Sequence, residues 1–269
     1  MPYQFTNGIR LSYQRSGRGE NVLLIMGSGA AGHVWTMHQT PALQEAGYQT
    51  IIFNNRGIPP SDSPEGKYSL EDMVADTKGL IEALDLAPCR IVGTSLGAII
   101  AQELAIGWPH LVKCAVLMAT RARSDTVRMA QSAADRTLLE SGIRLPRSYG
   151  AVSTAFKMLS PTTLNDDMAV SLWLQILELA GDGETIGAGQ QWIDTEEDRR
   201  DALRTIAVPC RVIAFADDLI APPHLCAEAA GAIPGADFIT IAGGGHLGHL
   251  ERPDETNAVI IEFLDKHKA

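Results

Sequence analysis

Short apolar runs recur along the chain and are separated by longer amphipathic segments. The continuous runs Val22–Met26 and Thr50–Phe53 are typical of strands that are covered on both faces. Ile9–Gln14 instead alternates polar and apolar residues, which predicts a half-exposed strand, and Asn7-Gly8 before it predicts a hairpin turn. Further runs at Arg90–Val92 and Cys114–Met118 complete a first series of expected strands.

Helical patterns lie between these runs. Ser69 supplies an N-cap, with acidic residues in the first turn, for an amphipathic helix that extends to about Leu86. Further helices are expected from Leu96 to about Gly107 and from about Glu251 to His267. Strands that alternate with helices predict an α/β fold, in which a mostly parallel central sheet carries helices on both faces.

The rhythm changes after Ala119. From about Arg121 to Thr205 the pattern is helical with no clear strand, and its best segments are Ser124–Ser141 and Leu164–Ala180, followed by a glycine-rich stretch at 181–189. Strand patterns resume at 209–215 and 238–241. We predict one α/β domain, residues 1–120 and 206–269, with an inserted helical lid at 121–205. A separate helical domain is disfavoured because strands on both sides of this segment need the same sheet.

Composition and charge restrict the class of protein. The chain has 269 residues, a net charge of −10 and 45% hydrophobic residues. Nucleic acids and anionic membranes select basic surfaces, so neither is expected as a partner. The amino terminus lacks the pattern of a signal peptide, and the apolar runs are too short to span a membrane. Four scattered cysteines, with no CxxC pair, predict buried reduced thiols in a cytoplasmic protein without a metal site. Nothing in the sequence indicates the oligomeric state.

The strongest chemical signal is Gly93-Thr94-Ser95-Leu96-Gly97, which joins an expected strand directly to an expected helix. The chain must reverse there within a few residues, and side chains at the two glycines would collide with their neighbours. The serine between them is held strained, with its hydroxyl projecting toward the first amides of the helix. Ser95 is therefore the predicted nucleophile. The pentapeptide alone also fits an ordinary turn, so its context must decide.

A serine nucleophile needs a base and a group that orients the base. Downstream of Ser95, one expected strand ends at the adjacent acids Asp217 and Asp218, and the next runs through three glycines into His246. The order Ser, Asp, His is the one expected for this type of turn. His246 is the predicted base, and His249 is expected to lie beside the site without a chemical role.

The oxyanion of the reaction also needs donors. The backbone amide of Leu96 follows the nucleophile, and the second donor is expected at Ser28, in the loop after the strand Val22–Met26. Gly27, Trp35 and Trp173 are the candidates for contacts with the substrate. Apolar residues of the expected lid favour a small apolar or aromatic acyl group, although many of them could simply pack the lid onto the core.

With these residues, the chain resembles the α/β-hydrolase fold family, and within it the lid-bearing esterase and peroxidase-like group. The shared motifs are the Ser95 pentapeptide, Asn55-Arg56-Gly57, Asp218-x-x-x-Pro222 and Gly245-His246-x-x-x-x-Glu251-x-Pro253. The resemblance implies the triad Ser95, His246 and Asp218, with Asp218 preferred over Asp217, and no cofactor. Two positions depart from the family pattern. Met26 replaces the usual histidine before Gly27, which removes a side chain that supports the oxyanion loop, and Asn55 replaces the aspartate before Arg56.

The expected reaction is hydrolysis of a small-molecule ester or thioester, including a carrier-bound acyl group, through an acyl-enzyme. An acyltransferase would use the same triad with an acceptor other than water, and perhydrolysis or C–C bond hydrolysis also stay open. Haloalkane chemistry would need a carboxylate in place of Ser95. An NADP-dependent oxidoreductase is suggested by Gly27–Gly32, which fits G-x-G-x-x-G, with Arg56 as a phosphate contact. No acid ends the second strand as that class requires. A non-catalytic binding protein on the same fold would not need all three triad residues.

Overall fold

A single eight-stranded sheet organises the protein in the computed structural model, which describes residues 2–180 and 188–268. The strand order is β1-β2-β4-β3-β5-β6-β7-β8. β1 and β2 pair antiparallel, as do β2 and β4, and all other neighbours are parallel. The strands are β1 (Tyr3–Thr6), β2 (Ile9–Gly17), β3 (Glu20–Ile25), β4 (Tyr48–Phe53), β5 (Cys89–Thr94), β6 (Val112–Met118), β7 (Cys210–Phe215) and β8 (Asp237–Ile241). The predicted mostly parallel sheet is confirmed.

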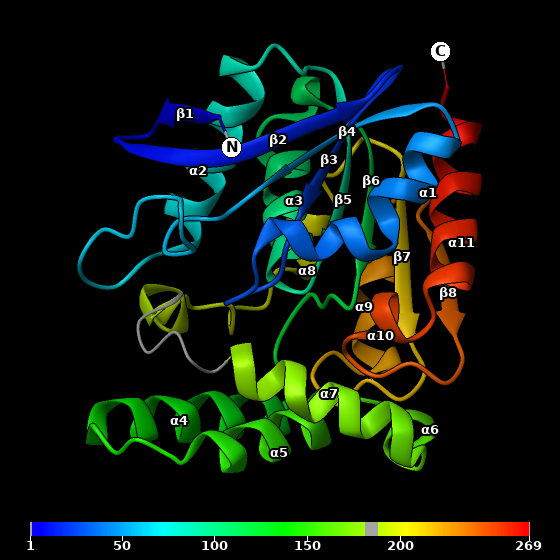
Figure 1. The fold of residues 1–269 in the computed structure, drawn as a ribbon. Coiled ribbons are helices and arrows are strands. Elements are labelled where there is room, and N and C mark those ends of the chain that lie inside the picture. Colours follow the sequence, from blue (N-terminus) through cyan, green and yellow to red (C-terminus); the bar gives the residue numbers. More distant parts are fainter. Residues whose placement is uncertain (1, 181–187, 269) are drawn as a thin grey trace.

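Helices cover both faces of this sheet, as predicted (Figure 1). α1 (Gln39–Glu45) packs with α11 (Pro253–Lys266) on one face, whereas α2 (Leu70–Ala83) packs with α3 (Leu96–Gly107) on the other. α8 (Arg200–Leu203) and α9 (Pro223–Ala232) continue the second layer. The central strands are buried throughout, since β5 and β7 contain no exposed residue.

Two local features explain the ends of particular elements. The predicted hairpin turn joins β1 to β2, and Asn7 and Gly8 both have positive φ angles, 45° and 79°, as a two-residue hairpin turn requires. The predicted last helix, from about Glu251 to His267, is confirmed as α11, and a separate short helix precedes it. A short α10 (Gly248–Glu251) ends before Pro253, which begins α11 because proline lacks the amide that a helix interior needs.

The segment between β6 and β7 is helical, and its helices other than α8 lie beyond the carboxyl ends of the strands (Figure 1). It contains α4 (Thr126–Ser141), α5 (Arg147–Met158), α6 (Pro161–Leu164), α7 (Asp167–Ala180) and α8, together with the 3₁₀ helix η3 (Ala188–Trp192). We call it the helical insertion. Two further 3₁₀ helices, η1 (Gly32–Met37) and η2 (Pro109–Leu111), lie in loops of the core. Most of the predicted glycine-rich stretch, residues 181–187, lies outside the described residues.

The four cysteines are free and buried, as the sequence predicts. Burial raises the pKa of the Cys89, Cys210 and Cys226 thiols to about 12, so that these groups stay protonated at neutral pH. Within the described part of the chain, no helix has both the length and the apolar character that crossing a bilayer would require.

Candidate active site

Ser95 occupies a strained turn between β5 and α3. Its φ of 53° and ψ of −120° are unusual for a residue other than glycine. A side chain at Gly93 would overlap the carbonyl of Gly97, and one at Gly97 would overlap the carbonyl of Ile25 in β3. Both glycines are therefore required by close backbone approach, and the turn presents the partly exposed Ser95 hydroxyl at the end of the sheet.

Three side chains from three strand ends meet at this point. His246 Nε2 lies 2.9 Å from Ser95 Oγ, and His246 Nδ1 lies 2.8 Å from Asp218 Oδ2. His246 and Asp218 are buried, with 5% and 2% of their surfaces exposed. The two contacts form a continuous chain from hydroxyl to imidazole to carboxylate, which is the arrangement that activates a serine.

The surroundings of Asp218 determine how protons are arranged in this chain. Burial by itself would raise the pKa of the Asp218 carboxyl. His246 and the amides of Ala221 and Ile220 together lower this pKa by more than burial raises it, so it lies below its usual value. An ionised carboxylate can only accept hydrogen bonds. Nδ1 of His246 is thus the donor to Asp218, and in a neutral imidazole Nε2 is left to accept from Ser95. Asp217 takes no part in this chain, and its amide donates to the carbonyl of Gly244.

Glu251 holds the loop that carries His246, a role that the sequence analysis did not assign. One carboxylate oxygen accepts from the Gly245 amide at 2.7 Å, and the other accepts from the amide and hydroxyl of Ser160, both at 2.8 Å. Ser160 is the N-cap of α6 in the helical insertion. Glu251 therefore connects the insertion to the histidine loop. Its place in the motif after His246 was the only available signal.

The expected oxyanion donors lie beside the nucleophile. Ser28 and Leu96 both line a pocket with Ser95, and a Cβ atom at Gly27 would lie 3.2 Å from Ser95 Cβ. The first amides of a helix lack intrahelical acceptors, which leaves the Leu96 N–H free for a substrate oxygen. Ser28 and Leu96 thus share a pocket with the Ser95 hydroxyl, and their backbone amides stay the predicted donors of an oxyanion hole.

Gln190 supports this loop from the helical insertion, and it was missed by the sequence analysis. Its Oε1 accepts from the Gly29 amide at 2.8 Å and from Ser28 Oγ at 3.3 Å, while its Nε2 donates to the Arg56 carbonyl at 2.7 Å. The side chain is 3% exposed. Met26 stands where the family resemblance implies a supporting histidine, and in this protein Gln190 donates to and accepts from the backbone around the loop. No local sequence pattern marks a contact over this separation.

Replacing Gln190 by methionine removes these bonds while keeping the side-chain length. We expect kcat for an ester to fall by between about 10- and 100-fold, because a loosened loop misplaces one oxyanion donor. The adjacent Gln191 also lines the pocket but is exposed, so Gln191→Met is the matched control. Steady-state kinetics of both variants test this, and equal losses would contradict a specific role for Gln190.

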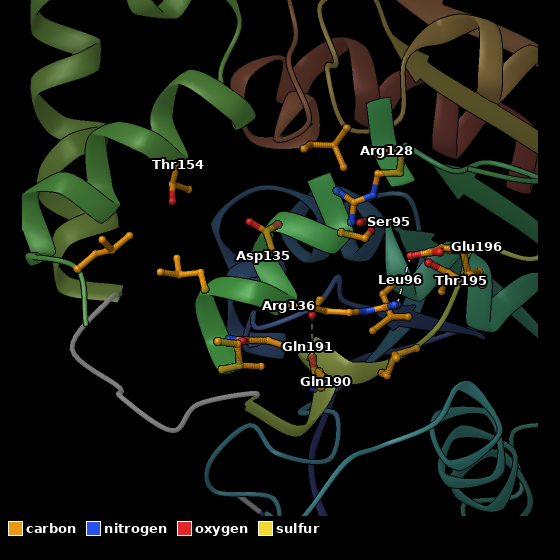
Figure 2. Close-up of a pocket in the computed structure, with 18 of the residues that line it drawn as sticks. Ser95, Leu96, Arg128, Asp135, Arg136, Thr154, Gln190, Gln191, Thr195 and Glu196 are labelled. Atoms are coloured by element: carbon orange, nitrogen blue, oxygen red, sulfur yellow. Dashed lines mark hydrogen bonds and ion pairs between the residues drawn. The ribbon is translucent and has the colours of Figure 1, made fainter. Parts of the chain in front are cut away.

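The pocket beside Ser95 has a volume of about 810 Å³ and lies between the core and the helical insertion (Figure 2). One wall comes from α4, including Arg128, Asp135 and Arg136, and another comes from the segment around Gln190. Apolar atoms come from Leu139, Ile143, Leu145, Ile193 and Ile220, among others. The pocket is therefore of mixed character, with charged groups close to the nucleophile.

Two expected substrate contacts need correction. Trp35 is fully buried in the core and packs against the ring of His249, 5.2 Å away, so it is not on the pocket wall. Trp173 lies on α7, which packs along α5, and it does not line the pocket either. An aromatic residue can pack in the core or contact a substrate, and only the tertiary packing shows which of the two it does. Gly27 lies close to Ser95, since a Cβ atom built on it would be 3.2 Å from Ser95 Cβ, but it is not among the residues that line the pocket either.

His249 is a buried neutral group. Burial, and then the nearby His246 and His38, lower the pKa of His249 to about 3. Neither of its ring nitrogens has a hydrogen-bond partner among the described residues. His249 therefore packs beside the site without joining the triad, as expected.

The depressed pKa of His249 makes the stability of the protein depend on pH. The unfolded chain takes up a proton below about pH 6.5, whereas the folded protein does not do so until about pH 3. Stability is therefore lost as the pH falls through this range. Between pH 7 and pH 5 this group should lower the free energy of unfolding by about 2 kcal/mol. Denaturant unfolding of wild type and His249→Leu at both pH values measures the difference, and identical pH dependence would contradict it.

Arg56 serves the structure of the core. Its guanidinium donates two hydrogen bonds, of 2.6 and 2.7 Å, to the buried carboxylate of Asp76. The segment after Gly27–Gly32 is a 3₁₀ helix, so no α-helix begins at the glycines to bind a pyrophosphate. Arg56 thus has a structural role and no α-helix begins at the glycines, so the oxidoreductase interpretation loses its support.

Comparisons with known proteins agree with the fold. A family model described as alpha/beta hydrolase fold matches residues 20–253. The protein of Mycobacterium tuberculosis named "Putative non-heme bromoperoxidase BpoC" is 44% identical over 263 residues, which are 97% of this chain and 100% of that protein. Its crystal structure has a TM-score of 0.92 at 43% identity, over 96% of this chain and 97% of that one. "Putative carbamate hydrolase RutD" of Azorhizobium caulinodans is 27% identical over 267 residues, 98% of each chain. A hydrolase of Pseudomonas aeruginosa PA01 has a TM-score of 0.85 at 25% identity, over 98% of this chain and 97% of that one.

Proposed function

This chain belongs to the alpha/beta hydrolase fold family, and from that premise we propose that it is a serine hydrolase that cleaves esters or thioesters through an acyl-enzyme. The observation that carries the proposal is the pair of short contacts at His246, 2.9 Å to Ser95 and 2.8 Å to Asp218. A protein that only binds a ligand would not need all three groups in this order.

The reaction follows from these contacts. His246 Nε2 takes the proton of Ser95 Oγ as the oxygen attacks the substrate carbonyl, and the amides of Leu96 and Ser28 bind the oxyanion. Collapse of this intermediate releases the alcohol or thiol, which receives the proton from His246. Water then attacks the acyl-enzyme with His246 again as base, and the acid leaves. Asp218 holds the imidazole tautomer and stabilises the imidazolium throughout.

The same acyl-enzyme can pass its acyl group to other nucleophiles. An alcohol, amine or thiol in place of water would make the protein an acyltransferase. Hydrogen peroxide would give a peracid and free Ser95, and the name of the relative from Mycobacterium tuberculosis, which is 44% identical, favours including this reaction. The name of the relative from Azorhizobium caulinodans adds carbamates to the acyl groups that merit testing.

A fluorophosphonate probe tests the proposal, because it reacts only with an activated serine. We expect stoichiometric labelling of Ser95, identified by peptide mass spectrometry, and none in the His246→Ala variant. A panel of esters, thioesters and carbamates, with and without hydrogen peroxide or an acceptor alcohol, then identifies the reaction. An unlabelled Ser95 would favour a binding protein on the same fold.

A further inference from the structure

Two arginines stand close to the candidate nucleophile without a carboxylate of their own. Arg121 follows β6 at the same end of the sheet as Ser95, and Arg128 lies in the first turns of α4. Both line the pocket with Ser95. In Figure 2 the Arg128 side chain points from α4 into the pocket on the Ser95 side. Within residues 2–180 and 188–268, neither guanidinium has a carboxylate oxygen within 4.0 Å.

The hydrogen bonds of these arginines leave their charges unbalanced. Arg121 is 6% exposed, and its side-chain acceptors in the described part of the chain are neutral oxygens, Ser124 Oγ at 3.3 Å and Thr195 Oγ1 at 2.7 Å. Nε of Arg128 is buried and has no partner among the described residues. A buried donor without an acceptor is costly, and an anion that accepts from it would remove that cost.

The carboxylates around the pocket are engaged elsewhere. Of the two that belong to the described part of its wall, Glu196 lies 3.2 Å from Arg136 and Asp135 lies 3.6 Å from Lys157. Asp125, which caps α4, accepts from the Arg128 amide and faces His224. Asp218 is bound to His246. Among the described residues of the pocket wall, Arg121 and Arg128 are thus left without a carboxylate partner, in a protein whose net charge is −10.

The charges of the two arginines also act on each other. Burial, and then the positive charge of Arg128, lower the pKa of Arg121 to about 10, and the negative charges of Asp218 and Asp125 only partly offset this effect. An anion between the two guanidinium groups would replace repulsion by two attractive contacts.

We propose that Arg121 and Arg128 form an anion subsite, and that the substrate is an ester whose acyl chain carries a carboxylate. The inference rests on the proposed function and specifies the substrate class of that site. Guanidinium groups bind carboxylates through paired hydrogen bonds, and the volume of about 810 Å³ accommodates a short dicarboxylic monoester with its carbonyl at Ser95.

The test is titration calorimetry in the Ser95→Ala background, which binds esters without cleaving them. The ligands are 4-nitrophenyl hydrogen glutarate, its neutral methyl ester and inorganic phosphate. We expect the anionic ester to bind at least about 10-fold more tightly than the methyl ester, as one charge-assisted contact allows. Arg128→Met should abolish this preference, and Arg128→Lys should keep part of it. Arg121→Met should also abolish the preference if this variant folds. If it does not fold, the variants of the half-buried Arg128 still test the subsite.

Arg123 is the matched control, since it lies between the two arginines in sequence, pairs with Glu228 and does not line the pocket. Arg123→Met should keep the full preference. Equal affinities for the two esters, or a preference that survives Arg128→Met, would overturn the subsite. Tighter binding of phosphate than of the anionic ester would overturn the carboxylate assignment. Turnover of the neutral ester by the wild type would keep the proposed function even then, whereas loss of Ser95 labelling would remove the function and leave the binding result intact.

Discussion

Ser95→Ala should lower the kcat of this protein for its best ester by about 10⁴- to 10⁶-fold, and His246→Ala should do the same. The two side chains act as a unit, because the hydroxyl cannot attack unless the imidazole 2.9 Å away takes its proton. Removing both should therefore cost little more than removing either one. Single-turnover and steady-state kinetics of the two variants and their double variant measure this.

His249 provides the control for His246, since it lies three residues away and is also buried. His249→Leu should keep kcat close to that of the wild type, because neither ring nitrogen contacts Ser95 or Asp218. Thermal unfolding identifies any loss that comes from stability alone. Comparable losses of kcat in His246→Ala and His249→Leu, with both variants folded, would reverse the assignment of the base.

Asp218→Asn should have the second largest effect, a loss of kcat of about 10⁴-fold. An amide can donate to Nδ1 of His246, which would favour the tautomer that carries its proton on Nε2 and can no longer accept from Ser95. The side chain keeps its shape, so the loss should appear in kcat more than in stability. It is measured with the same ester over pH 6–9.

Asp217 is the matched control for Asp218, since the two acids are adjacent and only one contacts His246. Asp217→Asn should stay close to wild-type activity. The backbone N–H of Asp217 donates to the Gly244 carbonyl, and the substitution keeps this hydrogen bond. A larger loss in Asp217→Asn than in Asp218→Asn would show that the wrong carboxylate had been assigned to the triad.

Much of this fold could be predicted from local pattern. Continuous apolar runs form β3, β4, β5, β6 and β7 because strands buried on both faces favour apolar side chains at successive positions, although β5 and β7 also bury Arg90 and Arg211. The turn at Ser95 could be predicted because Gly93 and Gly97 make close backbone contacts that only glycine permits. Carboxyl ends of parallel strands share one edge of a sheet, so the meeting of Ser95, Asp218 and His246 could be anticipated from their order.

Other residues of the site depend on contacts that no local pattern encodes. Gln190 supports the loop at Ser28 from 162 residues away, and Glu251 joins the histidine loop to Ser160 over 91 residues. Trp35 and Trp173 looked suited to a substrate, yet packing directs one into the core and keeps the other off the pocket wall.

Local sequence pattern was enough to predict most of the strands, the order of the candidate triad and the strained turn, because each depends on residues close together in the chain or on the direction of parallel strands. It did not predict the helices α1, α5 and α9. Only the tertiary structure decided what surrounds the nucleophile. Arg121 and Arg128 line the same pocket, and the nearby carboxylates of Glu196 and Asp135 form ion pairs with other residues, because of how the helical insertion packs over the sheet. Such packing is the sum of many weak long-range contacts, and charge balance in a pocket cannot be assigned before those contacts are known.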